Sequence, residues 1–168
     1  DVIHLHNLHG YYLDIEVLFD YLKSANKKVI WTLHDCWAFT GHCAYFDYAK
    51  CYKWETGGSE NCPQKKEYPK SIFLNRSKKN FARKKRAFTG VKDLTIVTPS
   101  NWLKNLVEWS FLKEYKVVTV YNGIDPNKFK PIKSDILKKY GLENKKILLG
   151  VANIWDRRKG FTDFIKLA

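Results

Sequence analysis

Val117-Val118-Thr119-Val120-Tyr121 runs directly into Asn122-Gly123-Ile124-Asp125, and this stretch decides the fold. The β-branched first half is typical of a buried strand, and the second half has the composition of a tight loop. A later apolar run, 146–152, leads to Arg157-Arg158-Lys159-Gly160. Because ligands of open α/β sheets bind beyond the carboxyl ends of strands, the two segments predict two strand ends that face one phosphate-bearing ligand.

The composition indicates a folded, basic protein. Of 168 residues, 45% are hydrophobic and 15% aromatic, which is enough for a substantial core. The net charge of +13 favours anionic partners such as nucleic acid, lipid headgroups or phosphate-bearing small molecules. No apolar run approaches the roughly 18 to 20 residues of a membrane span, so we expect a soluble or peripheral protein. The sequence lacks methionine, opens on a strand and closes on the start of a helix, so we expect it to be internal to a longer protein.

Strand and helix patterns alternate along the chain. Short apolar runs predict strands at 2–5, 29–33, 94–98, 117–121 and 146–152. Helical spacing of apolar residues predicts helices at 15–25, 71–87, 102–112 and 134–140, with another beginning at 161. Strand, helix and strand in this order form right-handed units with parallel strands, so the predicted class is α/β. The alternation of strand and helix patterns stops near 126–132, where we place a domain boundary.

The segment 36–69 is irregular. An irregular segment of this length inside a compact domain either has a function or is held by cross-links such as disulfides or a metal site. Its cysteines, Cys36, Cys43, Cys51 and Cys62, lack the paired spacing of a persuasive zinc site. Three interpretations stay open: a structural zinc site with His42 as an extra ligand, disulfides, or free buried thiols. Disulfides are the least favoured of the three in a cytoplasmic protein.

The segment 75–88 is strongly basic, with Phe81 and Phe88 interleaved. As a helix it suits an anionic membrane surface, where each basic side chain contributes about 1 kcal/mol. A solvated helix face is the plain alternative. A nucleic-acid patch is the third, but no RNA-stacking module or recognition-helix motif accompanies the segment, so we expect no nucleic-acid partner.

Taken in order, these segments resemble a retaining glycosyltransferase of family 4, which has the GT-B fold of two Rossmann-like domains facing each other. The specific motif is the strand end that leads into Asn122-Gly123-Ile124-Asp125. The supporting motifs are Pro99-Ser100-Asn101-Trp102-Leu103, His34-Asp35 after a strand, and Gly150-Val151-Ala152 leading to Arg158-Lys159-Gly160. The string from His34 to Cys43, with Cys62-Pro63-Gln64, looks like a subgroup that builds bacterial surface polysaccharides.

The resemblance implies that 1–130 is the end of the acceptor-side domain, with a Cys-rich insertion at 36–69, and that 131–168 begins the donor-side domain. It implies transfer of a sugar from a nucleotide-sugar to a saccharide or lipid-linked saccharide, with retention of configuration and no metal in catalysis. Such enzymes are cytoplasmic or peripheral on the inner face of the membrane. They also place a glutamate pair around the donor that this chain does not include, so we expect the fragment alone to be inactive.

The donor site is predicted around Lys159, where an ammonium and a helix start can neutralise a diphosphate leaving group. Gly160 and Arg158 belong to the same motif. The family usually has an arginine six residues before the lysine, and here that position is Asn153. Arg157 or Arg158 supplies the missing charge, or diphosphate binding is weaker than usual.

His34 and Asp35 are the predicted catalytic pair, because a strand-end histidine with an adjacent carboxylate can be oriented or charged by it. The resemblance gives His34 the role of contacting the transferred sugar. His9 and Gly10, after the first strand, are predicted to line the acceptor side, whereas His4 and His6 are assigned to structure. Residues assigned to the acceptor side and hinge are Ser100, Asn122, Gly123 and Asp125, with Ser100 explained equally well as a helix cap.

A non-enzymatic function is the alternative to glycosyl transfer. Asn153 in place of arginine is compatible with a non-catalytic basic module, either a degenerate transferase half or an adaptor for membrane or nucleic acid.

Overall fold

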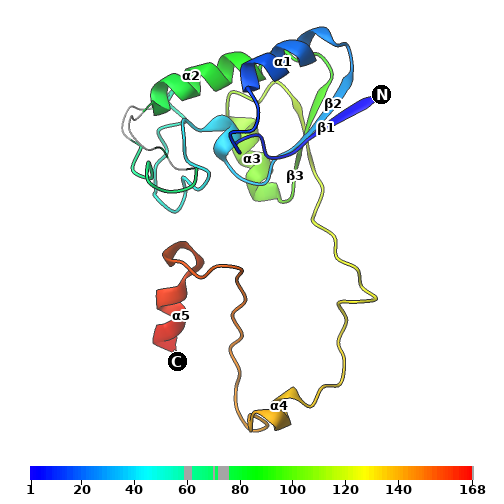
Figure 1. Cartoon of the computed structure of the whole chain (residues 1–168), viewed down its shortest axis with the longest axis vertical. Helices are drawn as coiled ribbons and strands as arrows, with labels where there is room; N and C mark the ends of the chain where they lie inside the picture. Colours follow the sequence, from blue (N-terminus) through cyan, green and yellow to red (C-terminus); the bar gives the residue numbers. More distant parts are fainter. Residues whose placement is uncertain (59–61, 70, 72–75, 168) are drawn as a thin grey trace. The chain divides into compact units, whose positions relative to one another are not determined.

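The computed structural model describes residues 1–58, 62–69, 71 and 76–167. The chain divides into two compact units, Asp1–Asn122 and Gly123–Ala168 (Figure 1). The stretch 123–130, which the sequence assigned to the first domain, therefore groups with the second unit. Each unit is described by itself.

A four-stranded parallel sheet forms the centre of the first unit. Its strands are β1 (Val2–Leu5), β2 (Lys28–Thr32), β3 (Leu94–Thr98) and β4 (Lys116–Thr119), in the spatial order of the sequence. All three strand pairs are parallel. The predicted α/β class is confirmed, and the sheet is that of a Rossmann-like fragment. Because every strand points the same way, the loops after β1 and β2 meet at one edge.

Helices connect the strands, as the periodicity predicted. They are α1 (Ile15–Ser24), the short 3-10 helix η1 (Trp37–Phe39), α2 (Ser77–Phe88) and α3 (Asn101–Trp109). The helix predicted at 71–87 begins only at Ser77, and 72–75 of the predicted range lie outside the described residues. Ser100 is the N-cap of α3 and accepts from the Leu103 amide, so its predicted capping role is confirmed. Helix α3 ends earlier than predicted because Ser110 leaves the helical conformation and its hydroxyl accepts from the Leu112 amide.

The core lies on one face of the sheet. Alternate residues of the central strands, including Val29, Trp31 and Ile96, are buried, and their sequence neighbours are partly exposed. Phe19 of α1 and Phe88 of α2 pack with Trp31, with ring centroids 4.6 to 5.3 Å apart. This aromatic cluster fixes both helices to the same face of the sheet.

The second unit contains helices but no strand among its described residues. Its elements are α4 (Ile136–Lys139), the 3-10 helix η2 (Arg157–Lys159) and α5 (Phe161–Leu167). The predicted strand at 146–152 is wrong for this structure. A lone strand leaves its backbone donors and acceptors unpaired, and the described part of the unit offers no second strand to pair with it.

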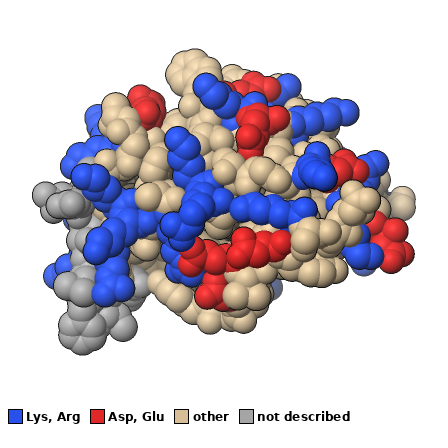
Figure 2. Space-filling view, turned by 90° about the horizontal axis from the view of Figure 1, so that it is seen from above, with Lys and Arg blue, Asp and Glu red and all other residues tan. Residues whose placement is uncertain are grey.

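Helix α2 is less solvated than its composition predicts. Phe81, Phe88 and Lys84 are buried, so the two aromatic residues that a membrane-surface helix would insert lie in the core instead. Arg83 binds Glu16 and Asp14, and Arg86 binds Glu16. Seen over α1 and α2, basic side chains dominate the surface with acidic ones between them (Figure 2). No helix in the described part of the chain is both long and apolar enough to cross a bilayer.

Lys84 is the exceptional basic residue of α2, with only 2% of its surface exposed. Its Nζ donates to the Trp37 carbonyl and lies 4.1 Å from the centroid of the Trp37 ring. Burial lowers the pKa of Lys84 from 10.5 to about 7, although Asp35 and Cys43 partly oppose the shift. The fold therefore favours the neutral amine, at an energetic cost whenever the side chain is protonated.

This burial makes stability depend on pH. Because the unfolded chain binds a proton at Lys84 between about pH 7 and pH 10.5 that the folded chain has lost, stability due to this residue rises with pH across that window. We expect Lys84→Met to remove this rise, which amounts to about 1.4 kcal/mol per pH unit at most, in urea unfolding followed by circular dichroism. Lys85→Met, on the exposed side of the same helix, should retain it. Identical pH slopes for wild type and Lys84→Met would contradict the assignment.

Candidate functional site

The loops after β1 and β2 bring the predicted acceptor-side residues together. Asp35 does not orient His34 as the sequence predicted. Its Oδ2 lies 3.0 Å from His9 Nε2, and its Oδ1 accepts from the Trp37 amide at 2.9 Å. His34 Nε2 instead lies 3.1 Å from His6 Nδ1. His34 and Asp35 lie in the loop after β2, and the two neighbouring residues have different partners.

His9 is the centre of a hydrogen-bonded line that also includes Tyr68. The His9 side chain is 4% exposed, and its Nδ1 lies 2.9 Å from the Tyr68 hydroxyl. Burial, followed by the charge of Asp35, raises the pKa of Tyr68, so its hydroxyl keeps its proton. Because a carboxylate can only accept, His9 Nε2–H donates to Asp35. This line fixes the ring and can hold a proton at a defined atom.

His34 belongs to an exposed ladder of imidazoles with His6 and His4. The ring centroids of His4 and His6 are 4.4 Å apart, and those of His6 and His34 are 5.4 Å apart. His4 Nε2 also lies 2.9 Å from Thr32 Oγ1. The sequence assigned His6 to structure, but it is the polar partner of His34. His4 belongs to β1, whereas His6 and His34 lie just beyond the ends of β1 and β2, so a strand pattern does not identify this contact in the sequence.

Two of the motifs that carried the resemblance contact each other at the end of β4. Asn101 Nδ2 donates to the Tyr121 hydroxyl at 3.2 Å, and its Oδ1 accepts from Thr119 at 2.9 Å. Asp125 has a local role, because its Oδ1 accepts from the Asn127 amide. Gly123 has neither a left-handed φ nor a neighbour that a Cβ would meet, so the backbone there does not require glycine. Asn122 is exposed.

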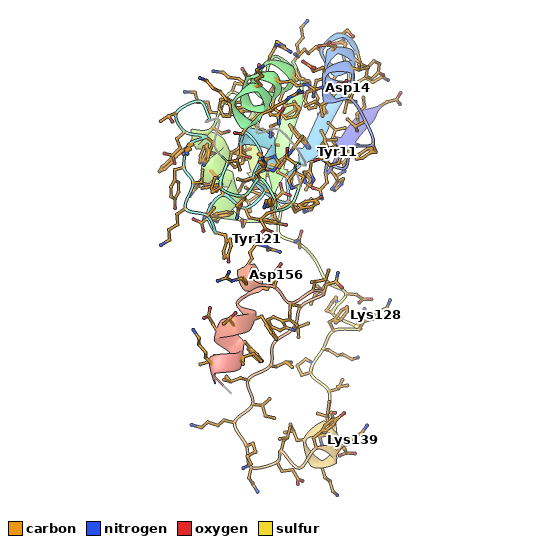
Figure 3. The ribbon with its side chains drawn as sticks, turned by 60° about the vertical axis from the view of Figure 1, so that its left-hand side comes forward. Tyr11, Asp14, Tyr121, Lys128, Lys139 and Asp156 are labelled. Atoms are coloured by element: carbon orange, nitrogen blue, oxygen red, sulfur yellow. The ribbon has the colours of Figure 1, made fainter. Side chains whose placement is uncertain are left out.

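The predicted donor residues lie in the second unit. Asp156 Oδ1 accepts from the Lys159 amide at 2.8 Å, and Asp156 Oδ2 lies 3.5 Å from Arg158. Gly160 follows with φ +72, a conformation that favours glycine. Lys159 and Asn153 are exposed. Asp156, labelled in Figure 3, therefore shapes the turn that presents the lysine.

The four cysteines are free thiols. Cys43 Sγ lies 3.0 Å from Cys62 Sγ, and this contact lowers the pKa of Cys62 and raises that of Cys43. Burial raises the pKa of Cys36. Over the part of the chain that the structure describes, no group of three or more His, Cys, Asp or Glu side chains is arranged to hold a metal ion. The arrangement gives the zinc prediction no support.

Two known proteins are similar to the chain in sequence. The putative colanic acid biosynthesis glycosyl transferase WcaC of Escherichia coli is 31% identical over 131 residues, which are 74% of this chain and 31% of WcaC. The processive diacylglycerol alpha-glucosyltransferase of Acholeplasma laidlawii is 37% identical over 83 residues, which are 47% of this chain and 24% of that protein. No family model matches the sequence, and no solved structure gives a significant match.

Both relatives are glycosyltransferases, and the matched stretch is less than a third of either protein. The parallel α/β sheet agrees with the Rossmann-like unit that the sequence motifs implied. Over the stretch that it shares with these two proteins, the chain is similar in sequence to glycosyltransferases.

Proposed function

We propose that the protein transfers a sugar from a nucleotide-sugar donor to a saccharide or lipid-linked saccharide acceptor, with retention of configuration. The observation that carries this proposal is the position of His34 in a glycosyltransferase relative. The residue follows β2 at the carboxyl edge of a parallel sheet, its ring is exposed, and it is held by His6 rather than neutralised by a carboxylate. An exposed, oriented imidazole at this edge suits hydrogen bonding to a bound sugar.

Asp35 takes a different role in this proposal from the one its sequence position first indicated. It positions His9 and the start of η1 through its two oxygens, so it acts on the shape of the loops. His9 and Gly10 then form part of the acceptor side, and catalysis needs no metal.

The donor diphosphate is assigned to the second unit. Lys159 supplies an exposed ammonium, and Arg158 supplies a second cation that Asp156 holds in place. Because Asn153 carries no charge, these two residues provide the positive charge of the motif. A basic adaptor without enzymatic activity is the alternative, and it differs by having no nucleotide-sugar affinity.

Lys159→Ala tests the donor assignment. We expect it to weaken nucleotide-sugar binding about tenfold or more, because a charge-assisted hydrogen bond to phosphate is lost, as measured by calorimetry on the whole protein. Lys128→Ala, an exposed lysine of the same unit, is the matched control and should bind like wild type. Donor binding that is equal in wild type and Lys159→Ala, or absent from both, would favour the adaptor.

His34→Ala tests the catalytic assignment. We expect kcat/KM for sugar transfer to fall at least about tenfold, because a hydrogen bond to the reacting sugar disappears. His4→Ala removes a histidine of the same ladder inside the strand and should lower kcat/KM much less. The assignment fails when both variants lose activity to the same extent while circular dichroism shows both folded.

Helix α2 is proposed to contact an anionic membrane through charge alone. With Phe81 and Phe88 in the core, the outer side of the helix exposes Lys78, Lys79 and Lys85 to solvent. Residue 75, the first of the basic segment 75–88, lies outside the described residues. This contact suits a lipid-linked acceptor and a cytoplasmic protein that is peripheral on the membrane.

Vesicle flotation tests that contact. We expect recovery with anionic vesicles to exceed recovery with neutral ones and to fall when Lys78 and Lys79 are both changed to Ala, at about 1 kcal/mol per side chain. Added salt should abolish the difference. Changing Lys113 and Lys116 to Ala removes the same charge outside α2 and should have a smaller effect. Equal recovery with neutral and anionic vesicles would reject the contact.

A further inference from the structure

Two cysteine thiols from distant parts of the irregular segment meet in the folded chain. Cys43 Sγ lies 3.0 Å from Cys62 Sγ, although 19 positions separate the two residues in the sequence. The S–S bond of a disulfide is about 2.05 Å long, so roughly 1 Å of movement would bring these free thiols to bonding distance. The proposed sugar transfer uses neither thiol.

Neighbouring backbone holds the two sulfur atoms in this contact. A backbone hydrogen bond from Gln64 reaches the thiol of Cys43 and also that of Cys62, so both sulfur atoms lie beside the same amide. The Thr40 hydroxyl donates to the Cys43 carbonyl at 2.6 Å, which fixes the backbone that carries one of the thiols. The fold of the segment therefore keeps the pair together.

The two thiols differ in their exposure to solvent. Cys43 is only 5% exposed, whereas Cys62 is partly exposed, so an oxidant in solution meets Cys62 first. The hydrogen bond from Cys43 also lowers the pKa of Cys62, in opposition to burial, and the charge of Lys53 adds to the lowering. Since the thiolate is the reactive form of cysteine, Cys62 is the nucleophile of the pair and Cys43 is its resolving partner.

The other two cysteines are not arranged in this way. In the described part of the chain, no second pair of sulfur atoms lies within hydrogen-bond distance. Cys36 is 2% exposed, and burial raises the pKa of its thiol, so it is a poor nucleophile. Cys51 is partly exposed and lies near Cys43, but it has no direct contact with that thiol.

We propose that Cys43 and Cys62 form a modification site, at which a peroxide converts the two thiols reversibly into a disulfide. The Cys62 thiolate attacks one oxygen of hydrogen peroxide and the O–O bond breaks, which gives a sulfenic acid on Cys62 and a hydroxide that takes up a proton. Cys43 then attacks the sulfenic sulfur, so that the S–S bond forms, the S–O bond breaks and water leaves with the proton of Cys43. The two electrons that the thiols lose reduce the peroxide to water, and a dithiol reductant reverses the reaction by exchange.

Peptide mass spectrometry on the whole protein tests the site. Reduced protein is treated with hydrogen peroxide, its remaining thiols are alkylated in denaturant, and the digest is compared before and after dithiothreitol. We expect a linked peptide that joins Cys43 to Cys62, lacks two hydrogens and separates into two peptides on reduction, with Cys36 and Cys51 alkylated. A link that involves Cys36 or Cys51, or alkylation of both Cys43 and Cys62 after oxidation, overturns the proposal.

Two variants and a matched control test the order of the steps. Cys43→Ser removes the resolving thiol, so the sulfenic acid should persist on Cys62 and be trapped by dimedone. Cys62→Ser removes the nucleophile, so the buried Cys43 should stay a thiol at the same dose of peroxide. Cys51→Ser, which changes a cysteine near Cys43, should form the disulfide as wild type does. Dimedone labelling of Cys43 in Cys62→Ser as fast as that of Cys62 in Cys43→Ser overturns the assigned order, and the wild-type peptide map stands without either variant.

Metal analysis and urea unfolding of wild type complete the test. Stoichiometric zinc that peroxide releases from the purified protein would make the two thiols metal ligands and overturn the proposal. Oxidised protein should unfold at a higher urea concentration than reduced protein, because the cross-link restricts the unfolded chain. An equal midpoint for the two forms contradicts a bond that holds the segment in its folded arrangement.

Discussion

Parallel pairing of four strands in sequence order is the constraint on which the rest of the first unit depends. It places the ends of β1 and β2 at one edge, so loops separated by more than twenty residues contribute to the same site. It also requires each connection to return across the sheet, and the Phe19, Trp31 and Phe88 cluster shows where two of these connections pack. The site is thus a consequence of strand direction, and its rigidity comes from the aromatic core beneath it.

The loops that follow β1 and β2 divide that edge into two chemical environments. One contains the exposed imidazoles of His6 and His34, and the other contains the largely buried pair of His9 and Asp35. A residue's neighbour in the sequence is therefore a poor guide to its partner in space. This is why Asp35 serves His9 although it follows His34 directly, and why Tyr68, from the irregular segment, completes the line.

Helix α2 shows how packing changes the meaning of a basic sequence. Its charges divide among a buried amine at Lys84, a surface network of Arg83 with Glu16, and lysines in solvent. Only the last group matches the solvated charge that composition suggests.

The sequence by itself determined the four strands of the sheet, the α/β class, the cap at Ser100 and the similarity to glycosyltransferases, because these depend on local periodicity and short motifs. The strand that the sequence predicts at 146–152 does not form, since a strand exists only with a partner to bond and a local pattern contains no information on partners. Tertiary structure alone decided that Lys84 is buried, that His6 meets His34 and that His9 meets Asp35. Each of these depends on which residues, distant in the chain, reach the same face of the sheet, and that is set by packing and not by spacing.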